Sequence, residues 1–323
     1  MHQDWVIARP LQEHTRIPLY IRALGPVQVE LGGTEVNLGP QQRVLLTALL
    51  LTRGRTVSKD QLADLLWPAP VPAGASVTLR SHIFNLRRLL EPERRAPSDF
   101  QVLVSSGARQ GGGYALRLSQ EESDLPQFWK LLADARRLTK QRSFQAARNC
   151  LTKALDLWRG PAFANITNCD FVDAEARRLN EVRLSAQEDR VELDLRLGQH
   201  REAIAALTLL LNEHPLCEGL WAQLMLALHR DDRRADALAA YQDVYQMLRD
   251  ELGVGPGARL QHLHQQVLSD DPALDLSASG AACGGRARKR HPALSQCSRR
   301  AIRATSPAFR TQFYPGLPGV LDY

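Results

Sequence analysis

The sequence has few of the features that mark a secreted, metal-binding or membrane protein. Only 5 cysteines occur among 323 residues, none in a CxxC pair or beside a histidine at metal-ligand spacing. We therefore interpret them as free thiols of a reducing compartment and expect no metal site. Nowhere do about 18 apolar residues run without a charge, and residues 1–20 lack the basic start and apolar core of a signal peptide. These absences predict a soluble, cytoplasmic protein without a membrane partner.

Catalytic and nucleotide-binding motifs are missing as well. The chain contains no GxxxxGK[ST], GxGxxG, HExxH or GxSxG. The glycine-rich stretch "GARQGGGY" favours a hairpin turn over a phosphate-binding loop, because no helix follows it. We expect neither an enzyme nor a bound cofactor.

Positive charge is distributed unevenly along the chain. Residues 21–118 carry 12 Lys and Arg against 7 Asp and Glu, and residues 277–323 carry 8 against 1. The whole chain has a net charge of +6, so the middle, residues 119–276, is acidic. This asymmetry suggests that one module meets nucleic acid and another does not.

The basic N-terminal part has the pattern of a small α+β domain. Apolar and polar residues alternate around Gly32 and Gly33, which predicts a β-hairpin. Helical periodicity follows Pro40, and a second short helix begins at Ser58, which stands at capping-box spacing from Gln61. A third helix, "SVTLRSHIFNLRRLLEPE", precedes two strands in "FQVLVSSGARQGGGYALRL". The predicted order is hairpin, three helices, hairpin.

From Asp124 to about Leu268 the pattern is helical throughout. "REAIAALTLLLNEHP" and "ADALAAYQDVYQMLRDE" align Ala203 with Ala237 at an offset of 34 residues, the tetratricopeptide period. Trp221 and Pro215 stand where that repeat has a large residue and an ending proline. After residue 276 the chain is rich in Ser, Gly, Ala, Pro and Arg without periodicity, which predicts disorder. The basic cluster "RARKR" there is either a solvated tail or a site of non-specific phosphate attraction.

The third helix holds the functional candidates. Leu79, Ile83, Leu86 and Leu90 form one apolar stripe, which we assign to the core. The remaining positions include no acid before Glu91, whereas a solvated helix usually mixes both signs. Arginine can form two hydrogen bonds with guanine, and asparagine can form two with adenine. Ser and Thr can bond phosphates or base edges. This inventory favours DNA binding over a merely solvated basic face.

These elements together resemble a known family. "LGPQQRVLLTALLLTRGRTVSKDQLADLLWP", "LRSHIFNLRRLL", "GGYAL", "ALDLWRGPAF" and "LRDELGVGPGARLQHLHQQVLSDDPAL" are similar to the Streptomyces antibiotic regulatory protein (SARP) family of transcriptional activators. The resemblance implies an N-terminal extension (1–20), an OmpR/PhoB-type winged-helix domain (21–118), an all-α, tetratricopeptide-like bacterial transcriptional activator domain (124–272) and a disordered basic tail (277–323). Since only 20 residues precede Ile21, we expect no receiver domain.

The resemblance also implies partners. The winged helix would bind direct repeats in double-stranded promoter DNA, with two protomers side by side, and help RNA polymerase holoenzyme to engage. The regulated genes would belong to a secondary-metabolite cluster, and the protein would lie in the bacterial cytoplasm, on the nucleoid when bound. The helical domain would support dimerisation and sense a signal.

By the same resemblance, Arg80, Ser81, His82 and Asn85 fall on the recognition helix, followed by an arginine pair, Arg87 and Arg88, while Arg109 and Gln110 lie in the wing. The complete set of predicted DNA-binding residues is Thr78, Arg80, Ser81, His82, Asn85, Arg87, Arg88, Arg109 and Gln110. Phe84 replaces a small polar residue common in the family, and Asn85 replaces an arginine. The alternative is a tetratricopeptide-type adaptor whose basic domain docks acidic partners without reading DNA.

Overall fold

The computed structural model describes residues 17–67, 72–94, 100–106 and 112–275. They form two compact units, one containing residues 17–134 and 150–185, the other residues 135–149 and 186–275. The division passes through three helices, α4 (Asp124–Lys140), α5 (Phe144–Asp156) and α6 (Asp170–Arg196). The predicted disordered tail lies outside the described residues.

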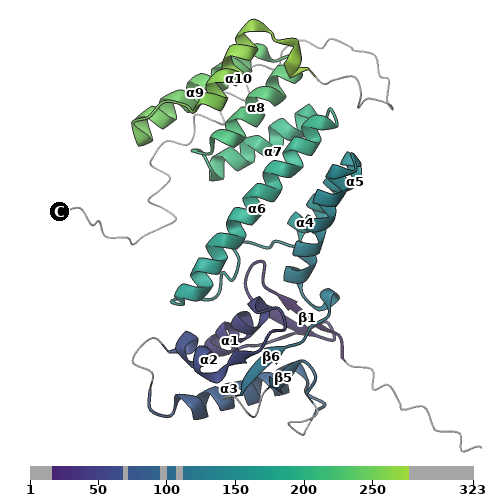
Figure 1. The fold of residues 1–323 in the computed structure, drawn as a ribbon, viewed down its shortest axis with the longest axis vertical. Helices are drawn as coiled ribbons and strands as arrows, with labels where there is room; N and C mark the ends of the chain where they lie inside the picture. The colour runs from purple at the N-terminus through teal and green to yellow at the C-terminus, as the bar shows by residue number, and fades with distance from the viewer. Residues whose placement is uncertain (1–16, 68–71, 95–99, 107–111, 276–323) are drawn as a thin grey trace, which may run out of the picture. The chain divides into compact units, whose positions relative to one another are not determined.

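The first unit combines two small sheets with three helices of its own (Figure 1). One antiparallel sheet has the order β1-β2-β3 and the other has the order β4-β6-β5. Its further elements, in chain order, are β1 (Leu19–Arg22), β2 (Gln28–Leu31), β3 (Thr34–Val36), α1 (Pro40–Leu51), β4 (Val57–Ser58), α2 (Lys59–Leu66), α3 (Ala75–Leu90), β5 (Leu103–Ser106), β6 (Gly113–Leu116) and the short 3-10 helix η1 (Gln120–Glu122). This is the predicted winged-helix architecture.

Local signals account for most of these elements. The β2–β3 turn has positive φ at Gly32 and Gly33, 56° and 82°, which glycine adopts without strain. Ser58 caps α2 by accepting from the backbone N–H of Gln61 at 3.1 Å, as the spacing predicts. Both hairpins and all three helices of the prediction are confirmed.

Two strands were missing from the prediction. β1 adds to the first hairpin and makes it a three-stranded sheet, with Leu19 opposite Leu31. β4 has only two residues, too few to show a period of two, yet it pairs with β6 through Ser58 and Gly113. A Cβ at Gly113 would come within 2.3 Å of the Val57 carbonyl oxygen, so this pairing requires glycine.

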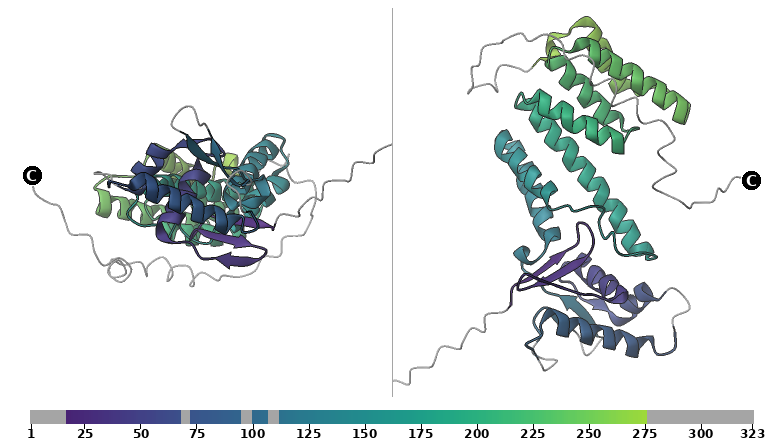
Figure 2. Two further views of the ribbon diagram at one scale, coloured as in Figure 1. Left: turned by 90° about the horizontal axis from the view of Figure 1, so that it is seen from below. Right: turned by 180° about the vertical axis from the view of Figure 1, so that it is seen from behind.

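The second unit is helical. Its further elements are α7 (His200–Glu213), α8 (Glu218–Arg230), α9 (Arg234–Leu252), α10 (Ala258–Ser269) and the 3-10 helix η2 (Pro272–Leu274), and the helices pack in sequence (Figure 2). α7 and α9 begin 34 residues apart, which agrees with the predicted repeat. Ala203 and Ala237 are fully buried, and the Trp221 indole donates a hydrogen bond to the Pro215 carbonyl at 2.7 Å. No helix in the described part of the chain is long and apolar enough to cross a membrane.

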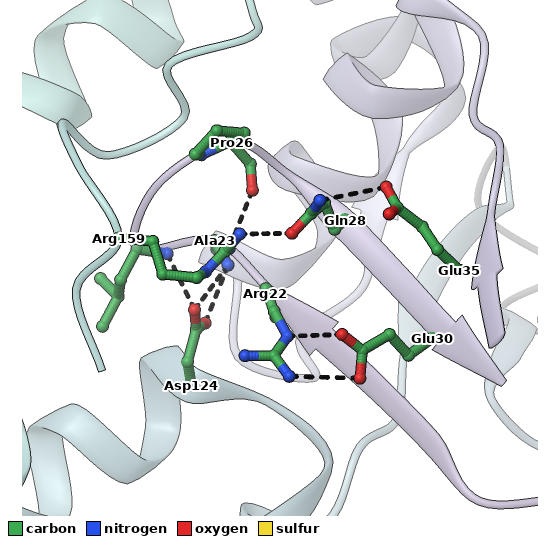
Figure 3. A network of polar contacts seen from close by, with 9 residues as sticks. Arg22, Ala23, Pro26, Gln28, Glu30, Glu35, Asp124 and Arg159 are labelled. Atoms are coloured by element: carbon green, nitrogen blue, oxygen red, sulfur yellow. Dashed lines mark hydrogen bonds and ion pairs between the residues drawn. The ribbon is translucent and has the colours of Figure 1, made fainter. Parts of the chain in front are cut away.

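Within the first unit, the loop after β1 is held by the helical half of the sequence. Asp124, the first residue of α4, accepts hydrogen bonds from the backbone N–H groups of Ala23 and Leu24 at 2.8 to 2.9 Å (Figure 3). Its carboxylate is buried, and burial raises the pKa of Asp124, although the N–H donors oppose that shift. The carboxylate thus satisfies backbone groups that no strand partner reaches.

A second segment holds the same loop from the turn between α5 and α6. Arg159 donates to the Pro26 carbonyl at 2.9 Å and also contacts the side-chain oxygen of Gln28 (Figure 3). Asn165 bonds both backbone groups of Val27, accepting at 2.7 Å and donating at 3.0 Å. Residues 124 and 159–165 are therefore part of the same packed body as the winged helix.

We predict that Asp124→Ala lowers the free energy of unfolding by about 2–4 kcal/mol, because it leaves two backbone N–H groups buried without an acceptor. The exposed neighbour Glu121 supplies the control, since Glu121→Ala should change stability by less than about 0.5 kcal/mol. Urea unfolding followed by circular dichroism measures both variants. Equal stability of the two would show that the Asp124 contacts contribute nothing.

Candidate nucleic-acid interface

The helix α3 lies along the outer edge of the first unit (Figure 1). One side of this helix is buried and the other is exposed. The predicted stripe of Leu79, Ile83, Leu86 and Leu90 is confirmed as core, with each side chain at most 2% exposed. Since these positions recur every three or four residues, they form one inner side of the helix, and the opposite side faces solvent.

The outward face contains most of the predicted DNA-binding residues. Thr78, Ser81, Asn85 and Arg88 follow one another at helical spacing, and all four are exposed. Arg80 is exposed beside them, whereas His82 is half-buried at the border. No carboxylate in the described part of the chain pairs with Arg80 or Arg88. The face is therefore polar and positively charged.

The short side chains of this face are ordered by their own helix. The Thr78 hydroxyl donates to the Gly74 carbonyl at 3.4 Å and the Ser81 hydroxyl to the Val77 carbonyl at 3.3 Å. Arg80 donates through Nε to the Ser76 carbonyl at 3.2 Å. Because each hydroxyl proton is directed toward the backbone, the oxygen lone pairs remain as acceptors on the surface.

Two apolar side chains interrupt the polar face. Phe84 is 50% exposed and Val77 61% exposed. Phe84 has Ser81 three residues before it and Arg88 four residues after it, so it lies among the polar side chains rather than at their margin. Phe84 therefore exposes apolar surface in the middle of the polar face.

Arg87, the first residue of the predicted arginine pair, does not lie on the outward face. Arg87 is only 8% exposed, and its guanidinium donates to the Leu103 carbonyl at 2.8 Å and the Ser105 hydroxyl at 2.7 Å. The same group lies 5.4 Å from the ring centre of Phe100 and 5.6 Å from that of Tyr114. Burial lowers the pKa of Arg87, although Tyr114 and Glu91 act in the opposite direction. The helical spacing carried the signal, because position 87 follows Ile83 by four residues and belongs to the inner stripe.

Glu91 was missed as a structural residue. It caps the end of α3, is 6% exposed, and accepts hydrogen bonds from the backbone N–H groups of Gln101 and Val102 at 2.9 to 3.0 Å. Its position four residues after Arg87 places it on the same inner side. Together Arg87 and Glu91 join the last turn of α3 to β5, the strand that leads into the wing.

The wing itself is described only at its base. β5 and β6 pair antiparallel from Leu103 opposite Leu116 to Ser106 opposite Gly113. Arg109 and Gln110, the two predicted wing residues, lie outside the described residues. The described part of the chain contains no group of three His, Cys, Asp or Glu residues arranged to hold a metal ion.

Known families match both parts of the chain. Residues 33–114 match the family "Transcriptional regulatory protein, C terminal", and residues 123–268 match the "Bacterial transcriptional activator domain". A winged helix with an exposed basic helix, joined to such a domain, defines a DNA-binding transcriptional regulator.

Similar proteins specify the family. Regulatory protein AfsR of Streptomyces coelicolor is 40% identical over 275 residues, which are 84% of this chain and 26% of AfsR. Regulatory protein DnrI of Streptomyces peucetius is 35% identical over 262 residues, 80% of this chain and 94% of DnrI. The solved structure of Mycobacterium tuberculosis EmbR, in complex with a low-affinity phosphopeptide, superposes with a TM-score of 0.73 at 34% identity, covering 80% of this chain and 66% of EmbR. The chain belongs to the SARP family of transcriptional activators, and it spans about a quarter of the length of AfsR.

The adjacent arginines of α3 differ in burial, and this difference predicts different effects on stability. Arg87→Met should lower the free energy of unfolding by about 1–3 kcal/mol, because it leaves the Leu103 carbonyl without its buried donor. Arg88→Met should change it by less than about 0.5 kcal/mol, because Arg88 is exposed. Thermal unfolding of the two variants tests this expectation, and equal midpoints would contradict it.

Proposed function

We propose that this protein binds promoter DNA through the outward face of α3 and recruits RNA polymerase holoenzyme there. The observation that carries the proposal is the continuous exposed row of Thr78, Ser81, Asn85 and Arg88, with Arg80 beside it and no acid among them. The 16 residues of α3 extend about 24 Å, and an α-helix fits the major groove, which is about 12 Å wide. We leave Arg87 out of the proposed contact set, because its guanidinium is buried and donates to the Leu103 carbonyl.

The division of labour on this face follows from side-chain chemistry. Asn85 has the donor and acceptor that match an adenine edge, and the arginines match guanine edges or phosphates. The hydroxyl oxygens of Thr78 and Ser81 can accept hydrogen bonds from amino groups on base edges, and the same hydroxyl groups can rotate to donate to phosphate oxygens. We propose that His82, at the border, contacts the DNA backbone, as do Arg109 and Gln110 in the wing. Two protomers on direct repeats would double this contact surface.

Selection of bound duplexes from a random pool, followed by footprinting of the selected site, tests the proposal. We expect one protected segment per protomer and a complex that survives excess non-specific DNA. Affinity should fall with added salt, since phosphate contacts release counterions. A chain that selects no common sequence at low salt would instead favour the adaptor function. Sedimentation of the complex counts the protomers on the DNA.

Asn85→Ala should relax the preference at one base pair and weaken binding to the selected site by about 1–3 kcal/mol. Affinity for duplexes already mutated at that base pair should stay unchanged, because the lost hydrogen bonds were not made there. Gel-shift titrations against the single-base variants measure both quantities. Arg177→Ala, on an exposed position of α6, is the control and should alter neither. Uniform weakening on every duplex would make Asn85 a backbone contact.

Phe84 should contribute preference for thymine, because an apolar side chain in the major groove packs against the thymine methyl group. Replacing that thymine by uracil removes only the methyl group and should cost about 0.8 kcal/mol, roughly a fourfold loss of affinity. In Phe84→Ala the same base change should have no effect. If the wild-type protein binds every uracil-substituted duplex as tightly as the thymine-containing duplex, Phe84 does not contact a thymine methyl group.

A further inference from the structure

The first unit contains a cavity of about 610 Å³ that the proposed DNA contacts do not use. Its walls come from the end of α1 and the turn after it, from the end of β6 and the segment that follows, and from the first two turns of α4. Small-molecule sites occupy about 300–1,000 Å³. The volume therefore suits a ligand of the size of a metabolite.

The inner surface of this cavity is mostly apolar. Leu50, Leu116 and Leu125 line it with side chains that are at most 6% exposed, and the half-buried Trp129 adds an indole. An apolar lining of this kind binds a ligand by removing its apolar surface from water, at about 25 cal/mol per Å².

The rim of the cavity carries positive charge only. Arg53, Arg117 and Lys130 belong to the lining, all three are exposed, and no Asp or Glu is among the lining residues. The Arg53 guanidinium carbon lies 5.3 Å from the centre of the Trp129 ring, which places one cation beside the indole. No carboxylate in the described ranges forms an ion pair with any of these three cations.

We propose that this cavity binds a small amphipathic organic anion. Its apolar body would lie against the leucines and Trp129, and its carboxylate, sulfonate or phosphate group would lie at Arg117 and Lys130. Duplex DNA does not fit this description, because its phosphates project from a polar surface and leave the leucines uncovered. The proposal does not rest on DNA binding by α3, since it concerns a separate set of residues.

Such a ligand would act on the frame of the winged helix. It would touch α1 and the segment leaving β6, which belong to the winged helix, and α4, which begins with the buried Asp124. Binding to the folded state alone stabilises that state in proportion to the logarithm of ligand concentration. The cavity is therefore placed to stiffen the winged helix when a metabolite is present.

Two fluorescent dyes provide the test. Anilinonaphthalene sulfonate has an aromatic body and one negative charge, and phenylnaphthylamine has the same body without the charge. Titrated against the full chain, the sulfonate should bind one site per chain more tightly than the neutral dye. The double variant Arg117→Gln/Lys130→Gln should weaken the sulfonate roughly three- to tenfold, as expected for exposed charge pairs, and leave the neutral dye unchanged.

Lys153→Gln, which removes an exposed lysine of α5 outside the cavity, is the matched control and should bind both dyes like the wild type. The proposal is overturned if the double variant loses both dyes equally, if it binds the sulfonate as tightly as the control does, or if random-sequence duplex DNA displaces the sulfonate. In a variant that melts like the wild type, the first result would show that the two cations support the apolar lining and do not select an anion. The second would show an apolar surface without an anion site, and the third a DNA contact. Circular dichroism melts of each variant accompany the titrations.

Discussion

Two buried carboxylates set the frame on which this winged helix depends. Asp124 accepts the backbone N–H groups that follow β1, and Glu91 accepts those that precede β5. In both places the main chain leaves or enters a short strand where no neighbouring strand supplies an acceptor, and a buried N–H without a partner is costly. Glu91 at the end of α3 and Asp124 at the start of α4 each supply the missing acceptor. The positions of α3 and α4 within the first unit follow from these bonds.

Glu91 and Arg87 act together, because both bond the backbone segment that enters β5. Arg87 donates to the carbonyl of Leu103, and Glu91 accepts from the backbone N–H groups just before it. The last turn of α3 therefore bonds both a carbonyl and the N–H groups of one backbone segment. These bonds on the inner side fix the orientation of α3 about its own axis, because rotating the helix would break both sets of hydrogen bonds. The side chains at positions 78, 81, 85 and 88 are therefore presented together without needing contacts of their own.

The sequence predicted what depends on periodicity and missed what depends on partners distant in the chain. The stripe from Leu79 to Leu90, the turn at Gly32 and the cap at Ser58 follow from local spacing, and all three are confirmed. The resemblance places Arg87 beside Arg88 in the DNA-binding set, although the spacing of Arg87 from Ile83 indicates the core. Asp124 and β4 carried no local signal, because their partners lie 101 and about 57 residues away. The contacts proposed for the outward face of α3 remain predictions.

The separation of roles on α3 has a consequence for how DNA preference can change within one fold. Substitutions on the outward face remove no buried group, so they should cost little stability. Substitutions at Arg87 or Glu91 leave buried partners unsatisfied, so they cost stability before they affect any base. Phe84 and Asn85 occupy two exposed positions, where the frame tolerates change. A regulator built in this way can acquire a new operator through a few exposed side chains while the bonds that orient the helix stay the same.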